Sequence, residues 1–159
     1  MRKLLVLGIG NSLLTDDGVG VLAAQTLQQE PWPEGVTVMD GGTFTQDIFY
    51  LFQDYDELLV LDVIHAGHAP GTLYTLTEDD LVANEKQRMS IHDIDMVDSL
   101  KMCELKNGRR PRMRIVGMEP HDITSWNIGL SAPCQAAFDD FLSLVRKEIT
   151  QLFDSMRTA

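Results

Sequence analysis

Residues 3–29, KLLVLGIGNSLLTDDGVGVLAAQTLQQ, change from the pattern of a strand to the pattern of a helix across one loop. Residues 3–8 are mostly apolar and end at glycine, which is typical of a strand buried on both faces of a parallel sheet. Residues 18–29 then space their apolar side chains as an amphipathic helix does. This stretch therefore predicts a strand, a loop and a helix in direct succession.

The rest of the chain repeats this alternation. Further strands are predicted at 36–39, 58–64, 72–76 and 112–118, and further helices at 46–52, at 93–105 and from Pro133 onward. Such alternation favours right-handed βαβ crossovers, so we expect an α/β three-layer sandwich, with a mostly parallel sheet of about five strands and helices on both faces. Because no linker or internal repeat interrupts the pattern, residues 1–159 are expected to form one domain.

The composition excludes several classes of function. Lys and Arg number 13 against 24 Asp and Glu, and the resulting net charge of −11 would repel nucleic-acid phosphates and anionic membrane surfaces. No apolar stretch approaches the roughly 20 residues that a membrane-spanning helix needs. The two cysteines are too few for a disulfide framework and form no CxxC motif, which favours a reducing cytoplasm.

Three separate segments place a possible metal ligand where an α/β sheet binds its ligands, beyond the carboxyl ends of the strands. Asp17 follows the first strand, Asp62 lies at the end of the third, and His92 precedes a helix. Two carboxylates and one imidazole suit nickel, zinc, manganese or iron, and three protein ligands leave coordination positions open. We therefore hypothesise a metal site formed by these three residues.

Each of the three residues also has a structural explanation. Asp17, with Asp16 beside it, could cap the following helix, because aspartate is a preferred N-cap residue. Asp62 could make a structural hydrogen bond that offsets the cost of its burial. His92 could be solvated or could act as a cap itself. Spacing alone leaves these alternatives open.

The glycine-rich loop also suggests nucleotide binding. Residues 8–13 begin like a GxGxxG loop, but Leu13 stands at the position of the third glycine. A pyrophosphate in this loop would meet Asp16 and Asp17, which would repel it. We therefore treat the nucleotide-binding loop as a structural analogy, in which the glycines serve the turn itself.

Other catalytic arrangements have weaker support in the sequence. Asp16, Asp40 and Asp62 could in principle supply an acid pair like that of aspartic proteases, a geometry that spacing cannot establish. No GxSxG motif is present, and Cys103 and Cys134 are predicted to be buried apolar residues. A local basic stretch is interpreted as a solvated loop and strand edge; it comprises Lys106, Arg109, Arg110, Arg112 and Arg114.

Five sequence blocks, in order, resemble those of the [NiFe]-hydrogenase maturation endopeptidases. They are LVLGIGNSLLTDDGVG at 5–20, DGGT at 40–43, LVLDVIHAGHAPGTL at 59–73, SIH at 90–92 and GMEP at 117–120. The first block is the most specific, since the pattern of this family is a GxGN turn followed by paired acids and a glycine. The resemblance extends from the first predicted strand to the last predicted helix.

This resemblance implies an endopeptidase that removes the C-terminal extension from the precursor of a [NiFe] hydrogenase large subunit after nickel insertion. It assigns metal binding and catalysis to Asp17, Asp62 and His92. The nickel would be supplied by the large-subunit substrate, and another divalent ion could occupy the same ligands. Asp40, or Asp16, would act as a general base.

Two departures from the family pattern concern specificity. Many relatives carry a second aspartate three residues after the strand aspartate, where this chain has His65. After DGGT, relatives commonly have a small residue, where this chain has Phe44 and Thr45. The alternative function is a nickel-sensing or chaperone module that binds the metal-loaded precursor without cutting it, because the sequence shows ligands but no nucleophile.

Overall fold

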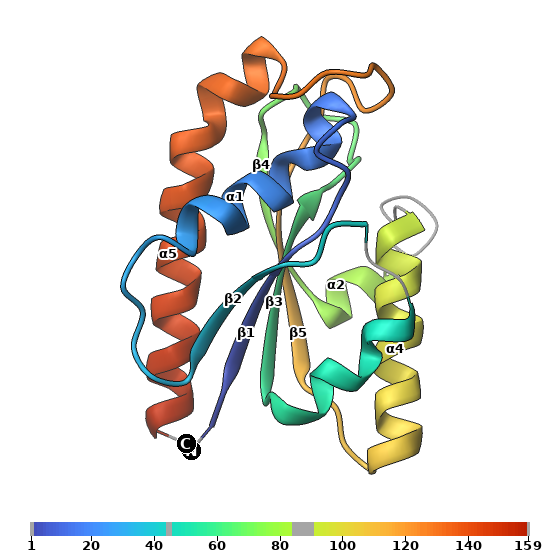
Figure 1. Cartoon of the computed structure of the whole chain (residues 1–159), viewed down its shortest axis with the longest axis vertical. Helices are drawn as coiled ribbons and strands as arrows, with labels where there is room; N and C mark the ends of the chain where they lie inside the picture. Colours follow the sequence, from blue (N-terminus) through green and yellow to red (C-terminus); the bar gives the residue numbers. More distant parts are fainter. Residues whose placement is uncertain (1, 44–45, 84–90, 159) are drawn as a thin grey trace.

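The computed structural model describes residues 2–43, 46–83 and 91–158, with the backbone alone for 46–49, 81–83 and 91–95. Five strands form one sheet in the order β2-β1-β3-β5-β4 (Figure 1). All neighbouring strands are parallel except β4, which pairs antiparallel with β5 at the edge. The strands are β1 (Leu4–Gly8), β2 (Val36–Asp40), β3 (Glu57–Val63), β4 (Leu73–Thr77) and β5 (Arg112–Met118). The predicted α/β fold with a mostly parallel sheet is confirmed.

Helices cover both faces of the sheet. The long helix α5 (Ala132–Thr158) and the shorter α1 (Val19–Leu27) lie on one face, and α4 (Ile91–Asn107) lies on the other with the 3-10 helix η2 (Gln46–Asp54) (Figure 1). A second 3-10 helix, η1 (Thr15–Gly18), connects β1 to α1, and α2 (Glu78–Ala83) follows β4. Within the described residues, no helix combines the length and apolar character that crossing a bilayer requires.

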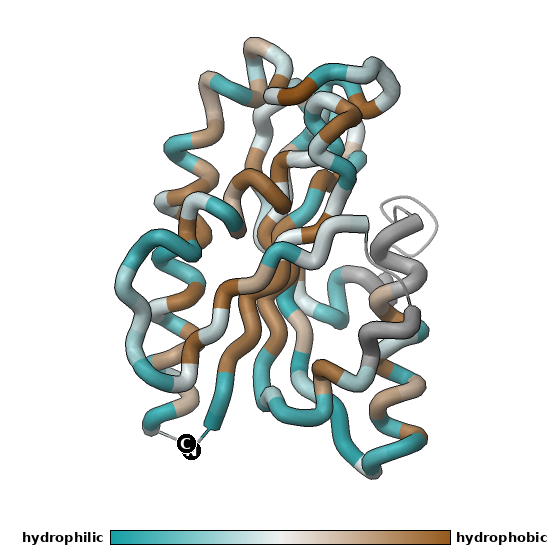
Figure 2. The backbone as a smooth tube through the Cα atoms, viewed as in Figure 1, coloured by the Kyte–Doolittle hydropathy of each residue, from teal (hydrophilic) through white to brown (hydrophobic). Residues whose placement is uncertain are grey.

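The central strands are buried on both faces because their side chains alternate between two apolar clusters. In β1, Leu4 and Val6 pack with α1 and α5, whereas Leu5 and Leu7 pack with α4 and η2. Every residue of β1 and β3 is buried, and the centre of the sheet is correspondingly hydrophobic (Figure 2). Uninterrupted apolar runs are the pattern that this environment selects.

Three local features differ from the sequence expectation. The helix predicted at 46–52 is the 3-10 helix η2. Helix α4 begins at Ile91, two residues before the predicted start. Helix α2 was not predicted, because it has only six residues and no apolar period; Thr77 and Asp80 start it with reciprocal hydrogen bonds between side chain and backbone N–H.

Glycines let the first loop and α1 lie directly against the sheet. A Cβ atom on Gly20 would stand 2.0 Å from the carbonyl oxygen of Leu61 in β3. Gly10 has a φ of +138°, and a Cβ there would stand 1.9 Å from the carbonyl oxygen of Asp17. The glycines of this loop therefore serve close packing of backbone on backbone, and that packing holds η1 beside the end of β3.

Substituting alanine for Gly20 should destabilise the protein, although the same change usually stabilises a helix by about 1 kcal/mol. The added methyl group collides with a main-chain oxygen, so α1 must move away from β3 at a cost of about 1–3 kcal/mol. Thermal unfolding measures the effect, with Thr26→Ala on the exposed side of the same helix as control. An unchanged or higher melting temperature in Gly20→Ala would contradict the close packing.

Candidate active site

The strand order reverses between β1 and β3. After β1 the chain continues into α1 on the α5 face, whereas after β3 it leads towards α4 on the opposite face. The crevice beyond the carboxyl ends of two such neighbouring strands is where open α/β sheets bind their ligands. Asp17 lies in η1, at the end of the loop that follows β1, and Asp62 is the penultimate residue of β3. Both predicted site residues therefore lie at the carboxyl ends of the parallel strands, and their role in a common site stays a prediction.

Asp62 is fully buried in an otherwise apolar strand. Leu58, Val60 and Ile64 belong to the cluster on the α4 face, so the strand alternation directs the Asp62 side chain to that face. Its Oδ1 accepts the N–H of Val63 at 2.8 Å. Because burying a carboxylate is costly, a position that serves only packing would favour an apolar side chain here.

Asp17 closes the glycine turn. Its carboxylate is almost fully buried, and Oδ2 accepts the N–H of Asn11 at 2.8 Å. Helix α1 begins after Gly18 and has no side-chain cap. The N-cap interpretation of Asp17 and its neighbour is therefore wrong, because both acids lie inside η1 and accept hydrogen bonds from other segments.

Asp16 joins η1 to a distant part of the chain. Its fully buried carboxylate accepts the N–H groups of His121 and Asp122, each at 2.9 Å, and both the N–H and the hydroxyl of Ser131, at 2.8 and 2.7 Å. Burial raises the pKa of Asp16, but these hydrogen bonds outweigh it and hold the pKa below its usual value. This bonding favours a structural role for Asp16: it fastens residues 121–131, here called the 121–131 segment, to η1.

Asp40 is the last residue of β2, so it also lies at the carboxyl end of the parallel strands. Its exposed carboxylate accepts the amide of Gln25 at 3.0 Å and the N–H of Gly42 at 2.9 Å. In the sheet register Asp40 is level with Gly8 and Leu61, so β1 separates it from β3 by about 10 Å. The general-base role of Asp40 stays a prediction, and any such role would act across β1.

His92 is the second residue of α4, and its side chain lies outside the described residues, as do Phe44 and Thr45. Helix α4 begins towards the end of the sheet at which the parallel strands finish (Figure 1). Among the described side chains, no group of three His, Cys, Asp or Glu residues could hold a metal ion. The metal site formed by Asp17, Asp62 and His92 therefore stays a prediction.

Glu119 is a buried acid directly after β5, at the carboxyl end of the parallel strands, and no role was predicted for it. Its Oε1 accepts the N–H groups of Ala66 and His68, at 2.9 and 3.1 Å, and the hydroxyl of Tyr74 at 2.7 Å. Burial raises the pKa of Glu119, but these hydrogen bonds outweigh it and keep the pKa below its usual value. Glu119 thus fixes the loop after β3, which carries His65. In the sequence, the signal that could have indicated this role is the position of Glu119 directly after the last predicted strand.

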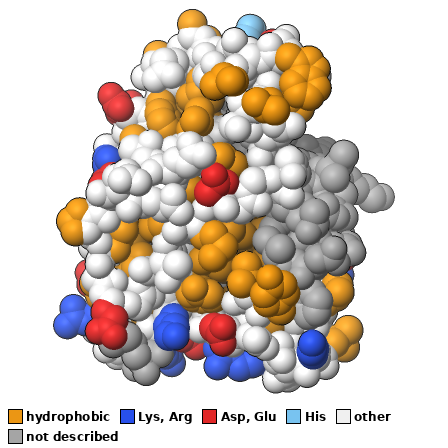
Figure 3. Space-filling model, viewed as in Figure 1, with side chains coloured by type: hydrophobic (Ala, Val, Ile, Leu, Met, Phe, Trp, Pro, Cys, Tyr) orange, Lys and Arg blue, Asp and Glu red, His pale blue; other side chains and the backbone are white. Residues whose placement is uncertain are grey.

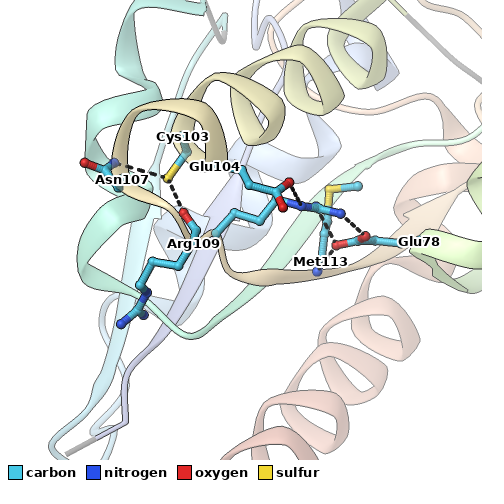
Figure 4. Close-up of polar contacts among 7 residues, drawn as sticks. Glu78, Cys103, Glu104, Asn107, Arg109 and Met113 are labelled. Atoms are coloured by element: carbon cyan, nitrogen blue, oxygen red, sulfur yellow. Dashed lines mark hydrogen bonds and ion pairs between the residues drawn. The ribbon is translucent and has the colours of Figure 1, made fainter.

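The contacts of Cys103 and of the basic stretch are with other residues of the chain, outside the candidate site. Cys134, in contrast, contacts the carbonyl of Glu119 at 3.5 Å. Figure 4 shows the Sγ of Cys103 between Asn107 and the carbonyl of Arg109. Glu78 and Glu104 both form ion pairs with the guanidinium of Arg110. Both cysteines are buried and free, as predicted. The four arginines form ion pairs within the chain: Arg109 with Asp56, Arg110 with Glu78, Arg112 with Glu57 and Arg114 with Glu148.

Known proteins resemble this chain over nearly its whole length. The hydrogenase maturation protease family model, HycI, matches residues 21–148. The hydrogenase 2 maturation protease of Escherichia coli K12 is 29% identical over 145 residues, which cover 90% of this chain and 88% of that protein. The hydrogenase expression/formation protein HupD of Rhizobium leguminosarum is 31% identical over 82% of this chain, but the match spans only 66% of HupD.

The solved structures agree with the sequence comparison. The E. coli hydrogenase maturating endopeptidase HybD superposes with a TM-score of 0.83 at 30% identity, covering 95% of this chain and 93% of HybD. The family that the five sequence blocks indicated is thus supported by a family model, by relatives and by a shared fold. On these grounds the chain belongs to the hydrogenase maturation protease family.

Proposed function

We propose that this protein removes the C-terminal extension from the precursor of a [NiFe] hydrogenase large subunit after nickel has been inserted. The observation that carries the proposal is the position of Asp17, in η1 after β1, and of Asp62, near the end of the neighbouring strand β3, where the strand order reverses. A protease acting on a folded, metal-loaded precursor needs its recognition groups at an open edge of this kind. Family membership supplies the reaction class.

Nickel enters this proposal as part of the substrate. Asp17, Asp62 and His92 would complete the coordination of a nickel ion already held by cysteines of the precursor. Two carboxylates and an imidazole are chemically suited to this ion, and another divalent ion could use the same ligands. Metal occupancy of the precursor would then be the signal that permits cleavage.

The peptide bond would be hydrolysed with help from the metal of the precursor. A bound divalent cation polarises a carbonyl group or lowers the pKa of a water molecule, so no serine or cysteine nucleophile is required. Burial raises the pKa of the Cys134 thiol, with the nearby Asp16 adding to this effect, which makes Cys134 a poor nucleophile. Asp40 is the candidate general base, because its carboxylate is exposed at the same edge.

Incubation with purified precursor tests the proposal. The wild-type protein should release the C-terminal extension from nickel-loaded precursor and leave nickel-free precursor intact, as measured by mass spectrometry of both products. Cleavage of both forms would contradict metal recognition. If neither form is cleaved, the endopeptidase function is contradicted.

The alternative function is a nickel-sensing or chaperone module without catalysis. It is favoured by the absence of a suitable nucleophile among the described cysteines, both of which are buried. A stable complex with uncut, nickel-loaded precursor in the same incubation would support this alternative.

The two buried free thiols are in keeping with a cytoplasmic location, which is part of the proposal.

A further inference from the structure

Three hydrophobic side chains lie exposed beside the crevice. The exposed fractions are 76% for Trp126, 79% for Ile128 and 47% for Leu13. Hydrophobic side chains gather at the top of the molecule in Figure 3, which is where the 121–131 segment and the first loop lie in Figure 1. We call the surface formed by Leu13, Trp126 and Ile128 the rim surface. Contiguous exposed apolar side chains often mark an interaction site.

The backbone joins these three side chains into one surface. Leu14 and Asn127 form a parallel bridge, and the N–H of Asn127 donates to the carbonyl of Leu13 at 2.9 Å. In this pairing Leu13 is level with Trp126. Ile128 follows the bridge residue Asn127 directly, and its side chain is as exposed as that of Trp126. The rim surface thus consists of two chain segments that are joined by one backbone bridge and that expose apolar side chains to solvent.

Hydrogen bonds of Asp16 and Asp122 hold the rim surface in place. Asp16 fixes both ends of the 121–131 segment. Inside the segment, the side chain of Asp122 accepts the N–H groups of Thr124, at 3.0 Å, and Ser125, at 2.9 Å, which closes the turn before Trp126. An exposed tryptophan on such a fixed turn loses little conformational entropy when a partner covers it.

Charge and position identify the partner. Residues 4–15 and 123–138 contain no charged residue, although the chain carries a net charge of −11. An uncharged, apolar segment is therefore the complementary ligand for this surface. Leu13 is four residues from Asp17 in the same loop, so a polypeptide seated on the rim surface reaches the crevice directly.

We infer that the rim surface docks an apolar, uncharged segment of the precursor polypeptide while its metal centre lies in the crevice. This inference rests on the proposed function, and it assigns substrate affinity to residues that need no part in the hydrolysis. Hydrophobic anchors of this kind, especially tryptophan, dominate the binding energy of protein interfaces.

Steady-state cleavage of nickel-loaded precursor by Trp126→Ala and Ile128→Ala tests the inference. Each variant should raise KM at least about tenfold and leave kcat nearly unchanged, because the lost contact binds substrate and transition state equally. The matched control is Leu105→Ala, which removes an 87% exposed leucine from α4 and should leave KM unchanged. Melting temperatures of all variants should equal that of the wild type.

The outcomes separate the docking surface from the function itself. If the wild type cuts and both rim variants keep its KM, the docking surface is refuted and the protease function stands. If the wild type does not cut, the proposed function fails, and calorimetric titration with uncut precursor then decides whether Trp126→Ala weakens binding. A wild-type dimer that becomes a monomer in Trp126→Ala would assign the surface to a second copy of the chain and overturn the inference.

Discussion

Asp62→Asn is expected to lower kcat/KM for nickel-loaded precursor by at least about 100-fold while leaving the protein folded. Asparagine has almost the same shape and can still accept the N–H of Val63 through its carbonyl oxygen. It lacks the negative charge that a carboxylate offers to a divalent cation. Removing a charge from a fully buried strand position should not lower the melting temperature. Mass spectrometry of the cleaved precursor and thermal unfolding measure the two effects.

Asp154→Asn is the matched control for this experiment. Asp154 is exposed in the last turns of α5, and its own substitution also removes one negative charge. It should retain wild-type cleavage, so a loss confined to Asp62→Asn cannot come from the change in net charge. Full processing by Asp62→Asn would remove this residue from the site, and a strongly lowered melting temperature would give it a structural role instead.

The buried strands were the most predictable part of the fold. A strand covered on both faces has no polar side, so β1 and β3 are visible in the sequence as apolar runs, one ending at Gly8 and the other interrupted only by Asp62 near its end. The strand directions were less accessible. The return of β4 as an antiparallel edge strand depends on its long-range pairing with β5, which no local pattern encodes.

The candidate site was predictable where it depends on the ends of strands and hidden where it depends on contacts between distant segments. Asp17 and Asp62 could be found because each follows or ends an apolar run. The role of Asp16 could not, because its hydrogen-bond donors are more than 100 residues away in the sequence. Glu119 was hidden for the same reason, since it contacts a loop about 50 residues earlier.

Asp16→Ala is expected to destabilise the protein by about 3–5 kcal/mol, the largest stability effect that the site offers. The substitution leaves the buried N–H groups of His121, Asp122 and Ser131 without their acceptor. For a protein of this size the melting temperature should fall by about 10 °C. Ser131→Ala is the graded control, because it removes only the hydroxyl donor and should cost about 1–2 kcal/mol.

The stabilising effect of Asp16 should depend on pH with a definite sign. Its pKa in the folded protein lies below the usual value of 3.8, so the ionised carboxylate stabilises the folded state above that pH. This contribution is lost as the pH falls below about 4, towards the pKa of the folded state. The difference in unfolding free energy between wild type and Asp16→Ala should therefore be constant from about pH 5 to 8 and should shrink in stronger acid.

The same substitution also distinguishes a local clamp from a general loss of structure. Asp16 fastens the 121–131 segment, so Asp16→Ala should make amide hydrogens of this segment exchange faster with solvent than those of β3. Because that segment carries Trp126, KM for the precursor should rise even at temperatures where the variant is fully folded. Uniformly faster exchange across the sheet would show that Asp16 stabilises the fold as a whole. Unchanged exchange in the segment, together with an unchanged melting temperature, would show that its hydrogen bonds do not hold η1 and the segment together.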